Sequence, residues 1–157
     1  MNQNEAIVNR NILIAVDQSE NAHRAVNYVA RLLGGIGGGF RVAVLHVILE
    51  PESDFFATPE EKENWLATNT REVEEMLAEY RQFLIDHGFA PENVSIHRPV
   101  RYCPSMAECI IAEQEILEYG TIVVGRKGMS RKEEMLFGSV SSKLVKIARN
   151  CAIWVIE

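Results

Sequence analysis

Short runs of consecutive apolar residues recur along the chain and predict the strands of a sheet. The runs are Asn11–Val16 (NILIAV), Phe40–Leu49 (FRVAVLHVIL), Thr121–Gly125 (TIVVG) and Ala152–Ile156 (AIWVI), with a shorter segment at Val94–His97. NILIAV and TIVVG do not alternate between apolar and polar residues, so both faces of these strands are expected to be covered. With Val94–His97 counted, they are the first and fourth strands along the chain. Val94–His97 is expected at the sheet edge, because Pro99 follows it.

Between these runs, apolar residues recur at steps of three and four, which is the pattern of amphipathic helices. The first predicted helix buries Ala22, Ala25, Val26, Val29 and Leu33; the others are Pro59–His87, a helix with Pro104 at its first position, and Ser139–Asn150. Strand and helix alternate through 157 residues, which predicts a single α/β domain over residues 1–157. The expected sheet is parallel, five-stranded and doubly wound, with helices on both faces and the first and fourth strands as neighbours.

Charge and composition exclude several classes of protein. The net charge of −6 and the pI near 5.3 argue against nucleic acid or an anionic membrane as the main partner. Residues 1–10 lack a basic start followed by an apolar core, and no apolar run approaches about 18 residues. A cytoplasmic protein is therefore expected.

The cysteine pattern indicates neither a disulfide framework nor a metal site. Cys103, Cys109 and Cys151 are odd in number and contain no CxxC pair, so neither a disulfide framework nor a zinc site is expected, and the thiols are expected to be reduced. Cys103 lies near a predicted helix start, where a thiol pKa falls, but no resolving cysteine neighbours it in sequence. No redox role is assigned to it.

The stretch Thr121–Lys143 combines a buried strand, a basic loop and a helix start, which is how doubly wound sheets build phosphate sites. Gly125, Gly128 and Gly138 would let the backbone approach a nucleotide, with phosphate on the amides of Gly138, Ser139 and Val140. Taken singly, each residue has a plainer interpretation: Gly125 ends a strand, Gly138 begins a helix and Ser139 caps it. Neither GxxxxGK[ST] nor GxGxxG is present.

Asp17 lies at the carboxyl end of the first strand, the edge where open parallel sheets bind ligands. It could hold a ribose hydroxyl, an adenine nitrogen or a metal; alternatively, Asp17 or Ser19 caps the next helix, and both can be true. The expected strand order places Asp17 opposite Gly125 across a crevice. His46, within an apolar strand, is expected to be packed or hydrogen-bonded rather than catalytic.

These motifs resemble the universal stress protein family over nearly the whole chain, from Asn11 to Glu157. The resemblance rests on Asp17-Gln18-Ser19 after the first strand, His46-Val47 at the end of the second, the glycine pattern and the short closing strand. It implies a Rossmann-like sheet of order 3-2-1-4-5, and the glycine pattern is that of the family's ATP-binding branch. Gln18, Gly120-Thr121 and Ala152 depart from the usual family pattern, but none of them touches the glycines.

The resemblance also implies roles for particular residues. Asp17 would contact the nucleoside or its Mg²⁺, and Val47 would offer its backbone to adenine. The remaining nucleotide contacts would come from Ala15 beside the base, Val124 and Gly125 at adenine and ribose, and Gly128, Gly138, Ser139 and Val140 at the phosphates. A homodimer would form through the last strand, at Ile153, Trp154, Val155 and Ile156.

Three functions fit this pattern. The first is an ATP-binding stress or signalling protein, read by an unknown protein partner. The second is a slow ATPase or a nucleotidyl-transfer enzyme, and the third is an interaction module without nucleotide. Binding without fast turnover is favoured, because an efficient hydrolase needs a positioned base, and the sequence offers one metal carboxylate, Asp17, and no assigned base.

Overall fold

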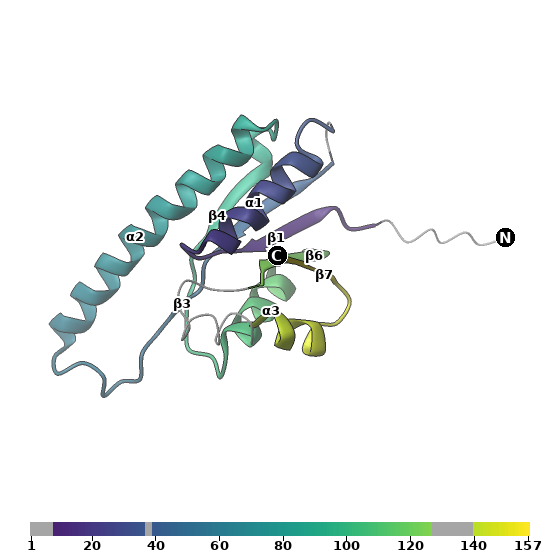
Figure 1. Ribbon diagram of the computed structural model, residues 1–157. Helices are drawn as coiled ribbons and strands as arrows, with labels where there is room; N and C mark the ends of the chain where they lie inside the picture. Colours follow the sequence, from purple (N-terminus) through teal and green to yellow (C-terminus); the bar gives the residue numbers. More distant parts are fainter. Residues whose placement is uncertain (1–7, 37–38, 127–139) are drawn as a thin grey trace.

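The computed structural model describes residues 8–36, 39–126 and 140–157 (Figure 1). Its elements are β1 (Asn11–Ala15), α1 (Glu20–Leu33), β2 (Arg41–Leu45), β3 (Ile48–Leu49), α2 (Pro59–Asp86), β4 (Val94–His97), β5 (Val100–Arg101), α3 (Met106–Leu117), β6 (Thr121–Gly125) and β7 (Ala152–Ile156). A short 3-10 turn at Pro91–Asn93 precedes β4, and residues 140–147 are helical. None of the described helices is both long enough and apolar enough to cross a membrane.

The main sheet has five strands in the order β4-β2-β1-β6-β7, and every neighbouring pair is parallel. This confirms the predicted doubly wound sheet, with β4 at an edge and the first and fourth principal strands, β1 and β6, as neighbours. Ala15 is level with Leu45 on one side and with Val124 on the other. The carboxyl ends of these three strands therefore meet at one edge.

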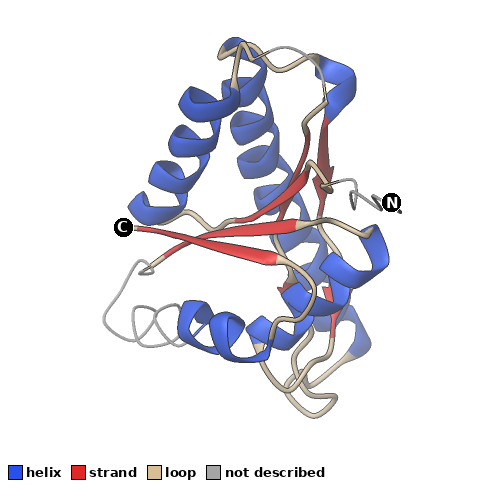
Figure 2. Cartoon of the chain, turned by 90° about the vertical axis from the view of Figure 1, so that its right-hand side faces the viewer, coloured by secondary structure: helices blue, strands red, loops and turns tan. Residues whose placement is uncertain are grey.

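Helices cover both faces of the sheet (Figures 1 and 2). Successive residues of a strand point to opposite faces: Ile12 and Ile14 belong to the core under α1 and α2, whereas Leu13 belongs to the core under α3 and residues 140–147. The buried residues predicted for the first helix all lie in the α1 core: Ala22, Ala25, Val26, Val29 and Leu33.

The predicted second strand, Phe40–Leu49, is wrong in its extent. The main-sheet strand β2 ends at Leu45, and Ile48–Leu49 forms β3, which pairs with β5 in a separate two-stranded sheet. The backbone N–H of His46 donates to the carbonyl oxygen of His97, and that of Ile48 donates to Pro99. Because proline has no N–H, Pro99 cannot donate the bond between these two, and the ladder is interrupted there.

The predicted start of α3 is wrong by two residues. The helix begins at Met106, and its N-cap is Ser105, whose Oγ accepts a hydrogen bond from the backbone N–H of Glu108 at 3.4 Å. Serine in this position satisfies a helix donor that would otherwise be unpaired, so the helix starts after it. Pro104 lies before the cap rather than at the first helical position.

The prediction of reduced thiols is wrong for Cys103 and Cys109, which form a disulfide with a Cα–Cα distance of 5.8 Å. Cys151 is free. The two cysteines are six positions apart, too far for a CxxC motif, but the chain turns at Pro104-Ser105 into the first turn of α3. This turn brings Cys103 back beside Cys109.

A core substitution tests the packing of the long helix. Leu84 on α2 is fully buried, at 0% exposure, so Leu84→Ala should lower the free energy of unfolding by about 2–5 kcal/mol through lost burial and a cavity. Leu32→Ala on α1, where the side chain is 46% exposed, is the matched control and should change it by about 0.5 kcal/mol at most. Urea unfolding followed by circular dichroism measures both; equal effects would contradict the described packing.

Candidate functional site

One pocket lies where the carboxyl ends of β1, β2 and β6 meet. It encloses about 460 Å³ of space, open solvent at its mouth included. Such a position, beside the strand at which the winding of the sheet reverses, is where open α/β sheets bind ligands.

The pocket brings together most of the residues that the sequence singled out. Its lining includes Ala15, Asp17, Val47, Val124, Gly125 and Val140. Asp17 and Gly125 thus lie at the same crevice, as the strand order predicts. The remaining candidates, Gly128, Gly138 and Ser139, lie outside the described residues.

Other lining residues were not among the candidates. They are Val16, Ser19, Ala22, Leu45, Met106 and Ile110. Met106 and Ile110 come from α3 and form an apolar wall. Ile110 has the same helical spacing as the core residues around it, so no local signal in the sequence distinguishes a residue of the pocket wall from an ordinary core residue.

Asp17 is held in place by its own turn and by the start of α1. Its Oδ1 accepts a hydrogen bond from the backbone N–H of Ser19 at 2.8 Å, and the Ser19 Oγ accepts one from the N–H of Ala22 at 3.1 Å. Ser19 is therefore the N-cap of α1. Of the two capping alternatives, Ser19 caps the helix and Asp17 orients the cap, while the Asp17 side chain still lines the pocket.

Two side chains hold the backbone at the end of β1. The Nδ1 of His46 donates to the carbonyl oxygen of Val16 at 2.6 Å, and the hydroxyl of Tyr80 donates to the carbonyl oxygen of Asp17 at 2.8 Å. His46 is thus hydrogen-bonded, as expected. The sequence predicts Tyr80 only as a packing residue on the apolar stripe of α2. Burial, reinforced by the charges of Asp17 and Glu79, raises the pKa of its phenol well above the ordinary value. The hydroxyl therefore stays protonated and remains a donor.

Val47 lies between β2 and β3 and lines the pocket. Within the described part of the chain, no backbone hydrogen bond involves its N–H or its carbonyl oxygen. Both neighbours are engaged, because His46 donates to His97 and Ile48 donates to Pro99. Buried backbone groups are nearly always paired, so the lack of a backbone partner among the described residues sets Val47 apart from both of its neighbours.

Gly125 is required by packing. A Cβ atom at this position would lie 2.7 Å from the backbone carbon and oxygen of Asn21 in α1. Real Cβ atoms do not approach backbone so closely, so a larger residue would push α1 away from β6. Packing against α1 therefore accounts for glycine at the end of β6, whether or not a ligand binds beside it.

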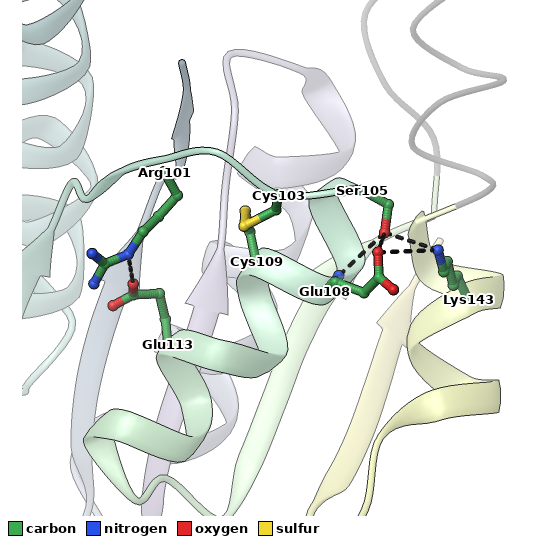
Figure 3. Close-up of a disulfide and its surroundings, with 7 residues drawn as sticks. All are labelled: Arg101, Cys103, Ser105, Glu108, Cys109, Glu113 and Lys143. Atoms are coloured by element: carbon green, nitrogen blue, oxygen red, sulfur yellow. Dashed lines mark hydrogen bonds and ion pairs between the residues drawn. A yellow bond between two sulfur atoms is a disulfide. The ribbon is translucent and has the colours of Figure 1, made fainter. Parts of the chain in front are cut away.

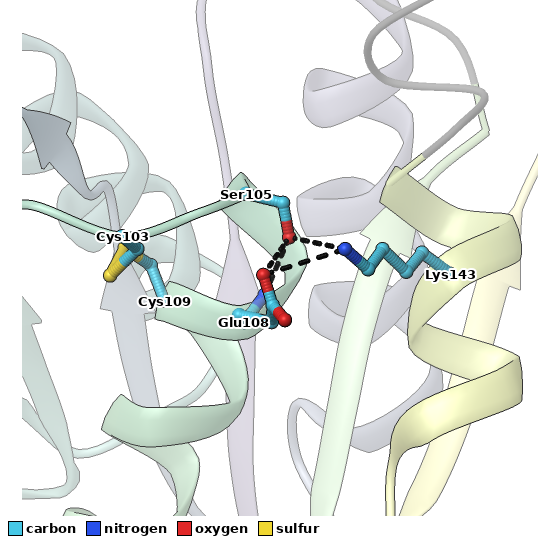
Figure 4. Close-up of polar contacts among 5 residues, drawn as sticks. All are labelled: Cys103, Ser105, Glu108, Cys109 and Lys143. Atoms are coloured by element: carbon cyan, nitrogen blue, oxygen red, sulfur yellow. Dashed lines mark hydrogen bonds and ion pairs between the residues drawn. A yellow bond between two sulfur atoms is a disulfide. The ribbon is translucent and has the colours of Figure 1, made fainter.

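A polar contact joins the two helical walls of the pocket (Figure 4). The Nζ of Lys143 donates to the Oγ of Ser105 at 2.9 Å and lies 3.4 Å from the Oε2 of Glu108. The Ser105 hydroxyl donates to the same carboxylate at 2.7 Å. This hydrogen bond from Ser105, supported by the Lys143 charge, holds the pKa of Glu108 below its usual value. The start of α3 is thereby tied to the helix over residues 140–147, which carries Val140.

The fold and the pocket define a doubly wound α/β protein with a pocket at the switch point of its sheet. The sequence model of the universal stress protein family matches residues 9–156. The chain therefore belongs to the universal stress protein family. No curated protein sequence matches it significantly.

Solved structures agree with this assignment. The chain resembles the hypothetical protein MJ0577, whose biochemical function was assigned from its structure, with 25% identity over 96% of each chain and a TM-score of 0.76. It also resembles a universal stress protein solved with cAMP, at 14% identity, covering 96% of this chain and 98% of that one, with a TM-score of 0.67. A universal stress protein from Archaeoglobus fulgidus solved with dAMP has 22% identity and a TM-score of 0.64, covering 96% of this chain and 100% of that one.

Removal of the Tyr80 hydroxyl tests how the site is supported. Tyr80→Phe leaves the carbonyl oxygen of Asp17 without its donor and should lower the free energy of unfolding by about 1–3 kcal/mol. Tyr102→Phe, at a side chain that is 70% exposed, is the matched control and should have little effect. Thermal and urea unfolding measure both. If the Tyr80→Phe variant is as stable as the parent protein, the hydrogen bond from Tyr80 to the carbonyl oxygen of Asp17 does not support the site.

Proposed function

We propose that this chain is a single-domain, cytoplasmic member of the ATP-binding branch of the family, and that it acts as a nucleotide-dependent stress-response or signalling protein. The observation that carries the proposal is the pocket itself. Residues far apart in the sequence, such as Ala15, Val47 and Val124, line one space at the carboxyl edge of the sheet. Those are the positions to which the family resemblance gives nucleotide contacts.

The walls of the pocket suit adenine. Met106, Ile110 and Val124 present apolar surface on which a flat aromatic base can be buried. The edge of adenine carries both hydrogen-bond donors and acceptors, and among the described residues the Val47 N–H and carbonyl oxygen have no backbone partner. An apolar slot with one such pair favours a purine over a sugar or an acidic peptide.

The polar side of the pocket suits the rest of a nucleotide. One carboxylate oxygen of Asp17 accepts a hydrogen bond from the backbone N–H of Ser19. In the proposal, the second oxygen accepts a hydrogen bond from a ribose hydroxyl or contacts Mg²⁺. Mg²⁺ is commonly held by one or two carboxylates together with substrate phosphates, so a single aspartate fits that metal when ATP is bound. In the proposal, Gly128, Gly138, Ser139 and Val140 hold the phosphates.

The relatives support an adenine nucleotide as the ligand class. The ligands named with two of the similar structures, cAMP and dAMP, share adenine, a pentose and one phosphate group. We extend this class to ATP because the glycine pattern of the sequence provides backbone for further phosphates. Asp17 is the one carboxylate, and no histidine is present, among the described lining residues. Binding without fast turnover is accordingly the proposed activity.

A homodimer through β7 is the second part of the proposal. β7 is an edge strand, and within the described part of the chain it pairs with β6 alone. Its residues Ile153, Trp154, Val155 and Ile156 are apolar, and an exposed apolar edge is usually covered by another chain. A two-fold axis would pair this strand with its own copy.

The nucleotide proposal is tested by calorimetric titration of nucleotide-free protein with AMP and with ATP and Mg²⁺. Micromolar binding, about −8 kcal/mol, is expected. Ala15→Leu extends a half-buried side chain into the pocket and should weaken binding at least about fivefold, since overpacking costs about 1–3 kcal/mol.

The matched control is Ala152→Leu, the same enlargement at an exposed alanine at the start of β7. The start of a parallel strand lies at the sheet edge opposite the pocket, so this variant should bind nucleotide like the parent protein. Absence of binding by the parent protein, or full binding by a folded Ala15→Leu variant, would overturn the proposed site.

The dimer is tested by placing a charge on the edge strand. Val155 is 40% exposed, so Val155→Lys should leave the fold intact and yield monomers by light scattering, because two like charges would meet across the two-fold axis. Ile96→Lys, on the opposite edge strand β4 at 37% exposure, is the control and should remain dimeric. Dimers that persist in Val155→Lys would exclude this interface.

A further inference from the structure

The disulfide joins the connection before α3 to that helix (Figure 3). Cys109 is 0% exposed and belongs to the core cluster under α3, whereas Cys103 is only partly buried at the edge of that cluster. The loop that the bond closes contains Met106, a lining residue of the pocket, and Ile110, a second lining residue, directly follows Cys109. The bond therefore holds the segment that presents this wall.

The same segment is connected to the opposite helical wall. Ser105, two positions after Cys103, caps α3 and accepts a hydrogen bond from the Nζ of Lys143 (Figure 4). Lys143 lies on the helix over residues 140–147, three positions after Val140, which lines the pocket. A change in the position of Ser105 would therefore act on both walls. Ser105, Glu108 and Lys143 form the contact through which the helices are held together.

We propose that the Cys103–Cys109 pair is a redox switch that sets the affinity of the pocket for adenine nucleotide, with the oxidised form binding more tightly. This inference rests on the proposed function. In the oxidised form the bond fixes Cys103 against the first turn of α3, so Met106 and Ser105 are held where the pocket needs them. In the reduced form the connection before α3 regains conformational freedom, and ordering it again costs binding free energy.

The accessibility of the two sulfurs sets the order of the oxidation step. The partly exposed Cys103 thiolate, close to the N-terminus of α3, attacks a hydroperoxide oxygen; the O–O bond breaks, a sulfenic acid forms, and water or an alcohol leaves. The Cys109 sulfur then attacks the Cys103 sulfur, and the hydroxyl leaves as water with the Cys109 proton. The two electrons that reduce the peroxide come from the two thiols.

Reduction runs through the same exposed sulfur. A dithiol reductant attacks Cys103, Cys109 leaves and takes up a proton, and the second thiol of the reductant releases Cys103 as the reductant becomes a disulfide. The sequence predicts a cytoplasmic protein, and disulfides that form in the cytosol are usually transient and redox-sensing. A reversible pair beside a ligand pocket fits such a setting.

The test is an AMP titration of the full chain after hydrogen peroxide treatment and after dithiothreitol treatment, with the state of the cysteines checked by mass spectrometry. The oxidised protein should bind at least about fivefold more tightly, the lower end of usual coupling between two sites. Cys103→Ser should bind like the reduced protein under both treatments. Cys151→Ser, at the free cysteine, is the matched control and should keep the full response.

Equal AMP affinity of the oxidised and reduced parent protein would overturn the switch and leave the proposed function standing. A response that survives in Cys103→Ser, or disappears in Cys151→Ser, would also overturn it. No AMP binding in either state would instead defeat the proposed function, and the switch with it. Hydrogen exchange of residues 102–110 gives a readout without nucleotide: faster exchange on reduction is expected, and unchanged exchange would contradict the mechanism.

Discussion

The pairing of β1 with β2 on one side and with β6 on the other is the constraint on which the rest of the structure depends. Ala15 is level with both Leu45 and Val124, so three strand ends meet at one edge. The winding of the sheet reverses at this point, which separates the connecting helices onto opposite faces and leaves a crevice between them. The lining residues at the ends of these strands, Ala15, Leu45 and Val124, owe their place to this register.

On the side of the crevice formed by the end of β1, the chain is held by hydrogen bonds to its backbone. His46 and Tyr80 donate to the consecutive carbonyl oxygens of Val16 and Asp17. These donors come from the end of β2 and from α2, so both neighbouring elements fix the chain where it leaves β1. A carbonyl that is already bonded holds its peptide plane in one orientation, and this orientation helps to hold the Asp17 carboxylate at the pocket.

The sequence predicts the sheet well because apolar runs bounded by glycine and polar residues are local signals, and it predicts most of the described pocket residues because strand ends and the family resemblance point to the same edge. The disulfide and the α3 wall were not predicted. Cys103 meets Cys109 only through the turn at Pro104-Ser105, and Ile110 has the spacing of a core residue. The break after β2 depends on Pro99, which lies in the connection between β4 and β5, far from β2 in the sequence.

Gly125 and Val47 carry different weight as signs of a ligand. Gly125 stands out in the sequence, but the backbone of Asn21 leaves no room for a Cβ atom there, so the fold would require glycine even without a ligand. Val47 is inconspicuous in sequence, yet its backbone donor and acceptor have no backbone partner among the described residues. An unpaired backbone group beside a pocket costs stability unless a ligand or water satisfies it. In this structure the backbone of Val47 is therefore a stronger indication of a ligand than the more conspicuous Gly125.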